Sequence, residues 1–242
     1  MTMPEFDITV KNTASTADDV ARIWCACFPS RDAAQDAALF AGVSDARTVF
    51  ITSDGQTAGM CNLVPLTFGS LRGIYLFAVG VLPGYRGKGG FRLLCETARA
   101  LAAREGYGFT ALVPADTILA DTYRRFGYTG QLRIPRYTVP ASAKLVRSAM
   151  PTPACNGNTV MPSRGFISYI RASYEDFRLG DSFLLCGAAK DGVRPVYEYI
   201  PGRAGIIPAP APAGSYGMIL PLSGGIAHRL DGASFYCSMG ED

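Results

Sequence analysis

A run of glycines and basic residues stands where a predicted buried strand gives way to a helix, and this run could bind a phosphate group. The run is Pro83-Gly84-Tyr85-Arg86-Gly87-Lys88-Gly89-Gly90. Glycines lack Cβ, so consecutive N–H groups can turn toward one ligand, and the start of a helix adds unpaired donors and a partial positive charge. A pyrophosphate would be held there. The side chains of Arg86, Lys88 and Arg92 can add charge.

Two common nucleotide-binding motifs do not fit this run. A P-loop requires GxxxxGK followed by Ser or Thr, but Lys88 is followed by Gly89. The dinucleotide fingerprint requires GxGxxG, and after Gly87 and Gly89 the last position is Arg92. An ordinary glycine-rich turn is the alternative without function, but such a turn rarely needs three glycines, an Arg and a Lys together. We therefore favour a phosphate-bearing ligand of another class.

The elements around the run form a predicted β-α-β unit. Apolar residues recur at helical spacing from Phe91 to Ala102, so this segment is predicted to be a helix with one buried face. The strands before and after it would be parallel neighbours. These strands are Gly73 to Leu82 and Phe109 to Val113, and a short helix over Ile118 to Arg125 and a strand near Tyr128 to Tyr137 follow them.

The chain opens with a predicted strand, a helix and a hairpin. Phe6 to Val10 alternates as a half-buried strand does, and Asp18 to Phe28 repeats apolar residues at helical spacing. Two apolar runs, Thr48 to Ser53 and Gly59 to Leu66, flank Asp54-Gly55-Gln56. Asp-Gly between such runs is the strongest short-range hairpin signal, so these runs are predicted to pair antiparallel.

A shift in composition, which we interpret as the connection between two domains, is marked by Pro135, Pro140, Pro151, Pro153 and Gly157. The expected division is a domain over 1–139, a Pro-rich connection over 140–160 and a smaller domain over 161–242. In the latter, Ser163 to Arg178 is predicted to be a helix. Ser182 to Ala189 and Val193 to Ile200 are predicted to form a hairpin around Lys190-Asp191-Gly192. Pro208 to Gly214 is predicted to be an extended surface loop that cannot pair in a sheet. Short strands are predicted at Tyr216 to Leu222 and Ala233 to Met239.

Bulk composition indicates a globular protein. The chain is 48% hydrophobic and 18% charged, and its net charge of +3 is scattered without a run of like charges, so nucleic acid is not an implied partner. It has no stretch of 18 apolar residues and no secretory pattern at its start, so we expect no membrane span and a cytoplasmic location. Seven cysteines without CxxC spacing disfavour structural zinc and are expected to be mostly buried, reduced thiols.

The segment from Val79 to Phe91 resembles the acetyl-CoA motif of GNAT acetyltransferases, in which Arg or Gln, two residues, Gly, one residue, then Gly or Ala form the cradle. Arg86 and Gly89 match this motif. Phe91 departs from the usual small residue at its last position, although bulky residues occur at that position in the Eis-like branch of the family. Tyr123-Arg124-Arg125-Phe126-Gly127-Tyr128 is similar to the family's Tyr-x-x-x-Gly-Phe/Tyr segment. The resemblance spans about residues 5 to 139, and the remainder suggests the second domain of Eis-type enzymes.

The resemblance implies an α/β fold with a central mixed, mostly antiparallel sheet flanked by helices, plus a second, smaller GNAT-like α/β domain. It implies acetyl-CoA as co-substrate, no metal, and direct attack of a primary amine in a ternary complex. It also implies that the strand through Val79 to Val81 splays from its parallel neighbour, leaving N–H and C=O groups free for pantetheine and the thioester carbonyl. The expected cofactor-binding residues are Val79, Gly80, Val81, Arg86, Gly87, Lys88, Gly89, Gly90, Phe91, Arg92 and Leu119.

Two residues are candidates for proton transfer. Tyr123 resembles the family's general acid. A phenol with a reference pKa near 10 stays protonated at neutral pH and can donate a proton to a departing thiolate of pKa about 8.5. The alternative is that Tyr123 is a core aromatic residue beside Phe126 and Tyr128. The terminal carboxylate can act as base in Eis-like proteins, which makes Asp242 a candidate, although a frayed tail is the interpretation we favour. An ordered water chain could also serve. His228 is the only histidine, and a lone imidazole is more often structural or solvated.

The amine acceptor is not readable from the sequence, and we expect either a small molecule or a peptide amine. Trp24, Phe28 and Phe68 could border an acceptor channel but are equally good core residues. The competing hypothesis is a non-catalytic CoA-binding or protein-interaction module of the same fold. It predicts saturable CoA binding without turnover. Oligomeric state and acyl-chain length are left open.

Overall fold

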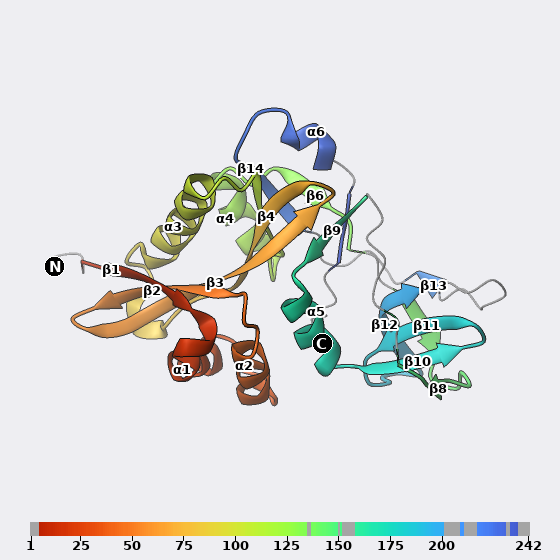
Figure 1. The fold of residues 1–242 in the computed structure, drawn as a ribbon. Coiled ribbons are helices and arrows are strands. Elements are labelled where there is room, and N and C mark those ends of the chain that lie inside the picture. Colours follow the sequence, from red (N-terminus) through yellow and green to blue (C-terminus); the bar gives the residue numbers. More distant parts are fainter. Residues whose placement is uncertain are drawn as a thin grey trace.

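Two β-sheets and six α-helices organise the described part of the chain (Figure 1). The computed structural model describes residues 5–134, 137–149, 151, 158–200, 209–210, 217–230 and 233–236 of the 242-residue chain. None of the described helices is long and apolar enough to cross a membrane. The helices are α1 (Ala17–Cys27), α2 (Ala33–Ala41), α3 (Gly90–Arg104), α4 (Thr117–Arg125), α5 (Arg164–Ala172) and α6 (Ile226–Leu230), with single 3₁₀ turns η1 (Thr13–Thr16) and η2 (Pro83–Tyr85).

The larger sheet has nine strands, of which seven follow the order β1-β2-β3-β4-β5-β14-β6. β9 pairs with β3 and β15 pairs with β9. The β4–β5 and β9–β15 pairs are parallel and the rest are antiparallel, which confirms the expected mixed, mostly antiparallel sheet. The strands are β1 (Asp7–Asn12), β2 (Arg47–Ser53), β3 (Gln56–Phe68), β4 (Leu71–Val81), β5 (Phe109–Leu112), β6 (Gly130–Leu132), β9 (Thr159–Pro162), β14 (Gly217–Pro221) and β15 (Ser234–Phe235).

Helices cover both faces of this sheet (Figure 1). α3 packs on one face against β2, β3 and β4, whereas α1 packs on the other face with α2 beside it. Aromatic rings fill the space under α1 and α2, where Phe77 of β4 lies 5.2 Å from Phe40 of α2 and 5.0 Å from Phe166 of α5, measured between ring centroids. The core is therefore built jointly by residues before and after the expected connection.

The smaller sheet has six antiparallel strands in the order β13-β7-β12-β11-β10-β8. Six buried side chains form its separate core: Val139, Phe177, Leu179, Leu184, Cys186 and Val196. A second sheet with its own core fits the expected second, smaller unit. Its strands are β7 (Tyr137–Pro140), β8 (Val146–Arg147), β10 (Glu175–Leu179), β11 (Ser182–Cys186), β12 (Val193–Ile200) and β13 (Ala209–Pro210).

Both predicted hairpins and the β-α-β unit are confirmed. The β2–β3 turn places Asp54 and Gly55 at φ 51° and 74°, and the β11–β12 turn places Asp191 and Gly192 at φ 50° and 80°. Positive φ at both central residues is what a two-residue hairpin turn needs, and Asp-Gly supplies it at low cost. β4, α3 and β5 follow one another with the two strands parallel, as predicted.

Three predictions about local structure are wrong. Ser163 to Arg178 is a helix only as far as Ala172, because Glu175–Leu179 pairs with β11. The predicted strand near Tyr128 to Tyr137 is two strands in different sheets, β6 and β7. Within the expected unpaired loop, Ala209–Pro210 pairs with β7 at the edge of the smaller sheet, where a proline is tolerated. The sequence prediction also omitted α2.

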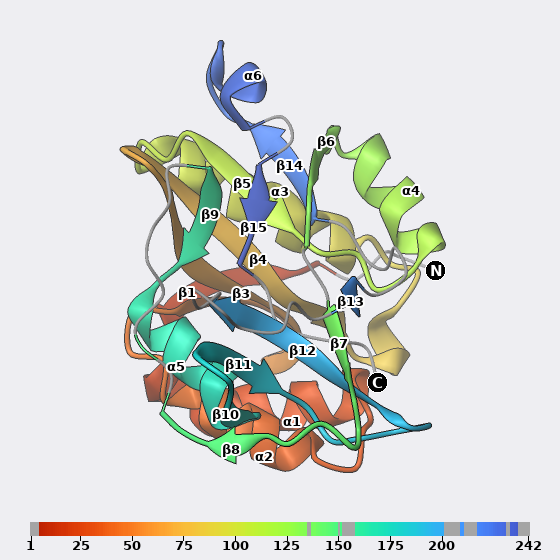
Figure 2. The same cartoon turned by 90° about the vertical axis from the view of Figure 1, so that its right-hand side faces the viewer.

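The two sheets do not follow the expected division at residues 139 and 161. β9, β14 and β15 all come from beyond residue 139, and all join the larger sheet. β14 lies between β5 and β6 and pairs antiparallel with both (Figure 2). After β6 the chain alternates between the sheets: β7 and β8 lie in the smaller sheet, β9 in the larger, β10 to β13 in the smaller, and β14 and β15 in the larger.

Candidate functional site

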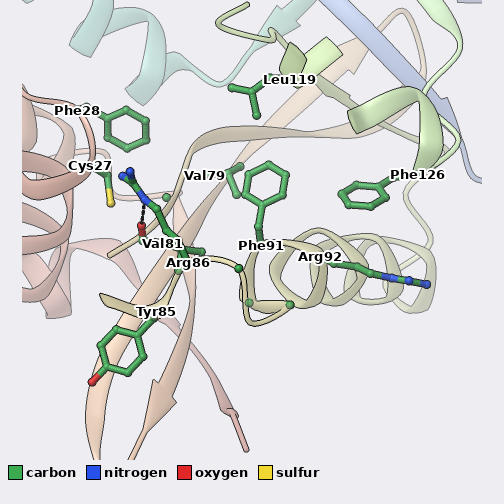
Figure 3. A pocket seen from close by; sticks show the side chains of 14 residues that line it. Cys27, Phe28, Val79, Val81, Tyr85, Arg86, Phe91, Arg92, Leu119 and Phe126 are labelled. Carbon is green, nitrogen blue, oxygen red and sulfur yellow. Dashed lines mark hydrogen bonds between the residues drawn. The ribbon is translucent and has the colours of Figure 1, made fainter. Parts of the chain in front are cut away.

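A pocket of about 630 Å³ opens where β4 ends and α3 begins (Figure 3). All the expected cofactor-binding residues line it except Lys88. Four other lining residues were not on that list: Cys27 and Phe28 from the end of α1, Tyr85 from η2, and Phe126 from the end of α4. The expected residues that line it are Val79, Gly80, Val81, Arg86, Gly87, Gly89, Gly90, Phe91, Arg92 and Leu119.

The end of β4 lines the pocket, and one of its edges has no partner among the described strands. β4 pairs with β5 only from Gly73 to Tyr75, whereas its pairing with β3 continues to Val81. A bulge interrupts the β3–β4 ladder near Ala78, which adopts a left-handed φ of 49°. Such backbone costs about 1–2 kcal/mol for a residue with a side chain. The strand therefore separates from its parallel neighbour before Val79, as the resemblance implies.

The start of α3 leaves its first backbone amides without a side-chain cap. Gly89 is the residue before the helix, with a left-handed φ of 83°, and no side chain of the described residues caps the helix there. By contrast, Asp116 Oδ1 accepts from the Leu119 amide at 2.7 Å at the start of α4, and Ser163 caps α5 in the same way. Free N–H groups and the helix dipole make the start of α3 suited to an anion.

The basic side chains of the glycine-rich turn divide between the pocket and the protein's own backbone. Arg86 lines the pocket, and its Nε donates to the Val81 carbonyl at 3.0 Å, which ties the turn to the end of β4. Lys88 turns away, since its Nζ donates to the Gly84 carbonyl at 3.0 Å. Arg92 lines the pocket while paired with Glu96. The backbone amides are thus the main anion-binding feature of the turn.

Cys27 enters the pocket wall from α1 and lies beside Arg86 (Figure 3). Burial raises the pKa of the Cys27 thiol, while a hydrogen bond from Arg86 and its positive charge act in the opposite direction. A Cβ on Gly80 would lie 3.0 Å from Cys27 Sγ, so the close approach of α1 to β4 depends on glycine there. The expectation of buried thiols is confirmed for Cys61, Cys95 and Cys186, but Cys25 is exposed and Cys27 is half-buried.

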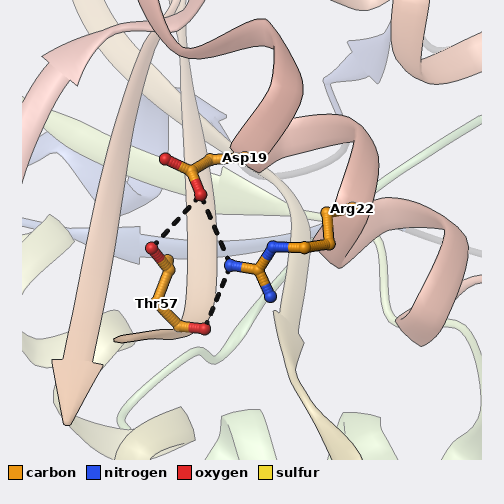
Figure 4. A network of polar contacts seen from close by, with 3 residues as sticks. All are labelled: Asp19, Arg22 and Thr57. Carbon is orange, nitrogen blue, oxygen red and sulfur yellow. Dashed lines mark hydrogen bonds and ion pairs between the residues drawn. The ribbon is translucent and has the colours of Figure 1, made fainter. Parts of the chain in front are cut away.

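Polar contacts hold α1 against the start of β3 (Figure 4). Asp19 Oδ1 accepts hydrogen bonds from Arg22 and from the Thr57 hydroxyl, both at 3.3 Å. Arg22 also donates to the Thr57 carbonyl at 3.3 Å. These contacts help to fix α1, whose last turn carries Cys27 and leads to Phe28. Sequence reasoning named Phe28 only as one of three aromatics, because its arrival at the pocket depends on tertiary packing.

Tyr123 lies behind the pocket and does not line it. Its side chain is 5% exposed, and its ring centroid is 5.6 Å from that of Phe91, which does line the pocket. Burial raises the pKa of Tyr123 well above its usual value, with smaller contributions from Cys95, Cys61 and Tyr128. The hydroxyl therefore carries its proton at neutral pH, as a general acid requires.

The other sequence candidates lie elsewhere. Trp24 packs in the aromatic core 5.5 Å from Phe77, and Phe68 is buried, so of the three aromatics named for an acceptor channel only Phe28 lines the pocket. His228 is exposed on α6. Asp242, the candidate base, lies outside the described residues.

Comparison with known proteins identifies a family whose model matches the part of the chain that forms the pocket. The family model for an acetyltransferase (GNAT) domain matches residues 10–130. Among curated proteins, none matches the sequence. Similar solved structures include a GCN5-related N-acetyltransferase from Kribbella flavida, with 14% identity, TM-score 0.55, and 90% of this chain and 71% of that chain covered. A GCN5-related N-acetyltransferase from Anabaena variabilis has 15% identity and a TM-score of 0.53, with 90% of this chain and 73% of that chain covered. A probable N-acyltransferase from Enterococcus faecalis has 14% identity and a TM-score of 0.56, with 76% of this chain and 56% of that chain covered. At these identities the structures support the fold.

Proposed function

This chain belongs to the GNAT acetyltransferase family, and from that premise we propose that it moves an acetyl group from acetyl-CoA to a primary amine by direct attack in a ternary complex. The observation that carries the proposal is the start of α3, which no described side chain caps and which opens onto a pocket beside the end of β4, where no described strand pairs with the second edge. The acceptor would be a small molecule or a peptide amine. Membership of the Eis-like branch stays a prediction.

The residues of the pocket fit coenzyme A in two places. The amides at Gly89, Gly90 and Phe91 would hold the diphosphate, because the first amides of a helix lack intrahelical partners. The edge of β4 from Val79 to Val81 would hold the pantetheine arm by strand-like hydrogen bonds, since no described strand pairs with that edge. Leu119 and Phe91 supply the apolar wall.

Acetyl-CoA supplies an activated thioester, and the chain's own groups would position and polarise it. Free N–H groups near Val79 to Val81 would stabilise negative charge on the carbonyl oxygen. Tyr123 is the proposed donor of a proton to the leaving thiolate, and its raised pKa keeps that proton in place until it is needed. Asp242 or an ordered water chain would take the proton from the amine.

The position of Tyr123 also favours a second candidate function, a non-catalytic CoA-binding module. Its ring is buried behind Phe91 and does not line the pocket. A module of this kind would bind CoA through α3 and β4 but would lack a proton donor beside the sulfur. The two functions make opposite predictions for turnover.

A thiol-release assay with acetyl-CoA and a panel of amines tests the proposal. We expect release with at least one primary amine, and we expect Tyr123→Phe to lower kcat by about 10²–10⁴-fold while leaving the Kd for CoA unchanged. Tyr128→Phe is the matched control, because it removes a buried hydroxyl from the same cluster, one bonded to Thr110 at 3.0 Å. Its kcat should stay near that of the native chain.

Three results would change the account. CoA binding without thiol release for any amine would favour the non-catalytic module. Full activity in Tyr123→Phe would remove Tyr123 from the chemistry while leaving acetyl transfer intact. Equal losses in Tyr123→Phe and Tyr128→Phe would indicate a structural effect of the cluster.

A further inference from the structure

β1 is the longest of the described strands that end a sheet (Figure 1). It has six residues and pairs with β2 in one uninterrupted register, without a bulge. The other end strands are short, with three residues in β6 and two each in β8, β13 and β15. Short end strands limit pairing between molecules, and β1 lacks this protection. No described strand pairs with its outer edge, so the backbone N–H and C=O groups there can accept a further strand.

Two of the exposed side chains of β1 are large and apolar. Ile8 is 42% exposed and Val10 is 40% exposed. They lie opposite Ile51 and Val49 of β2, which are fully buried, so all four share one face of the sheet. An apolar row that is buried on β2 therefore reaches solvent on β1. A matching apolar strand on the outer edge would cover it.

The charges of β1 lie on the opposite face, symmetrically about its middle. Asp7 stands two residues before Thr9, and Lys11 stands two residues after it. Side chains two residues apart in a strand share a face, so these three residues lie together. Ile8 and Val10 flank Thr9 in the same symmetrical way. Reversing the strand about Thr9 therefore exchanges the two apolar residues and places each charge where its opposite was.

We propose that two copies of this chain pair through β1, antiparallel, with a two-fold axis that passes by Thr9. In this register Asp7 lies opposite Lys11 of the partner subunit, and Ile8 lies opposite Val10 of the partner subunit. Two-fold symmetry makes each contact twice, and residues directly opposite in an antiparallel pair share a face, so apolar residues meet apolar ones and opposite charges meet.

The self-complementary pattern favours a second copy over a strand of unrelated sequence, and it favours the antiparallel direction. A parallel pair in register would place like charges side by side, which is unfavourable. The inference is independent of the proposed function, because no residue of β1 lines the pocket. A contact made mainly by one strand is small, so we expect a dissociation constant on the order of 10 µM and a dimer in exchange with the monomer.

Analytical ultracentrifugation without ligand, from about 1 µM to about 200 µM protein, tests the proposal. The mass of the native chain should rise from 25.8 kDa toward twice that value. Asp7→Lys and Lys11→Asp should each weaken the dimer at least about tenfold, because each replaces two opposite-charge contacts by two like-charge contacts. Both side chains are exposed, so the variants should fold, and their melting temperatures check this.

Mixing the two variants is the decisive arm. In a mixed dimer, both charge contacts again join opposite charges, so an equimolar mixture of Asp7→Lys and Lys11→Asp should associate about as well as the native chain. Lys144→Asp is the matched control, since it changes the net charge as Lys11→Asp does, at an exposed site between β7 and β8 in the smaller sheet. It should leave the association unchanged.

Amide hydrogen exchange locates the contact. Exchange over residues 7–12 should slow as the concentration of the native chain rises, and it should stay constant in Asp7→Lys. A chain that remains monomeric at about 200 µM would overturn the proposal. Association that survives in both single variants, or exchange in β1 that does not depend on concentration, would overturn it by placing the contact elsewhere. Weak association of the mixture, or an equal loss in Lys144→Asp, would overturn the antiparallel register.

Discussion

A glycine with a positive φ lies at each end of α3, but the two ends differ in whether the protein supplies hydrogen-bond partners for the backbone groups there. Gly89 precedes the helix at φ 83° and Gly106 follows its last turns at φ 74°, and a Cβ on either would meet nothing within 4 Å. At the C-terminal end the protein supplies its own partners, since the Tyr107 amide donates to the Ala102 carbonyl at 3.0 Å. At the N-terminal end the amides have no side-chain cap among the described residues.

The same contrast holds along β4. From Gly73 to Tyr75 the strand has partners on both edges, and Gly73 packs so closely that a Cβ would lie 2.4 Å from the ring of buried Phe109. From Val79 to Val81 no described strand pairs with the second edge, where the Val81 carbonyl accepts from Arg86 Nε. The pocket lies where both elements have backbone groups without a partner in the part of the chain that the structure describes. The comparison indicates that the proposed CoA site depends on backbone groups with no partner among the described residues, because similar glycine conformations at the two ends of α3 do not distinguish them.

The largest expected effect comes from blocking the open end of α3. Gly89→Glu places a carboxylate beside the proposed diphosphate site, and like-charge repulsion of several kcal/mol should weaken CoA binding more than about a hundredfold. CoA at about 100 times its Kd should raise the stability of the native chain by about 2.7 kcal/mol, which is measurable as a higher Tm. That rise should vanish in the variant.

Gly106→Glu is the matched control for this change. It introduces the same side chain at a similar φ and into similar open space, at the opposite end of the same helix. Its Tm in the absence of ligand should fall as that of Gly89→Glu does, but the rise on adding CoA should remain. A rise of equal size in both variants would show that the start of α3 does not bind the ligand.

The next effect uses Cys27 as a reporter of the pocket. In a Cys25→Ser background, CoA at about 100 times its Kd should slow alkylation of Cys27 about 100-fold, by mass action. Because burial raises the pKa of Cys27 above its usual 9.0, the rate without CoA should keep rising with pH above 9. Mass spectrometry of the alkylated peptide measures both rates. Alkylation that proceeds at the same rate with and without CoA would place the ligand elsewhere.

The smallest effect concerns the closed end of α3. Arg47 pairs with Glu105 through two hydrogen bonds of 2.8 and 2.7 Å, and both side chains are about one-third exposed. Arg47→Gln should lower the free energy of unfolding by about 1 kcal/mol at pH 7, since solvent screens the pair in part. It should leave CoA affinity unchanged. Loss of CoA binding in this variant would mean that the two ends of α3 are coupled.

The pH dependence of this loss has a definite sign. The hydrogen bonds from Arg47 lower the pKa of Glu105 in the folded chain, so the stabilisation is present above the unfolded pKa of about 4.3 and fades as pH falls through the lower folded value. Urea unfolding should therefore show a constant difference between native and Arg47→Gln chains from pH 6 to 8. The difference should shrink below about pH 4, and a difference that grows there would contradict the assignment.

Local sequence signals were sufficient for the elements that build the pocket. Strand, glycine-rich turn and helix follow one another at β4, η2 and α3, so hydrophobic period and glycine spacing locate the site within one stretch of chain. The Asp-Gly turns fixed both hairpins for the same reason. Lys88 was predicted to bind the cofactor, but its Nζ donates to the Gly84 carbonyl. Sequence spacing does not determine which rotamer the Lys88 side chain adopts.

Long-range pairings were beyond local signals. Met218 of β14 pairs with Leu112 of β5 and with Gln131 of β6, which lie 106 and 87 residues earlier in the chain, and nothing in the alternation of Gly217–Pro221 identifies those partners. Cys27 and Phe28 reach the pocket because α1 packs across β3 and β4. Glu175 to Arg178 was predicted to belong to a helix, but pairing of Glu175–Leu179 with β11 overrides that local prediction.

The most direct test of the central claim follows individual backbone amides by NMR during titration with CoA. We predict that the ¹H and ¹⁵N shifts of Gly89, Gly90 and Phe91 change most, with smaller changes at Val79 to Val81, while Gly106 and Tyr107 stay unchanged. Largest changes at Gly106 and Tyr107, or no change at the start of α3 under saturating CoA, would contradict it.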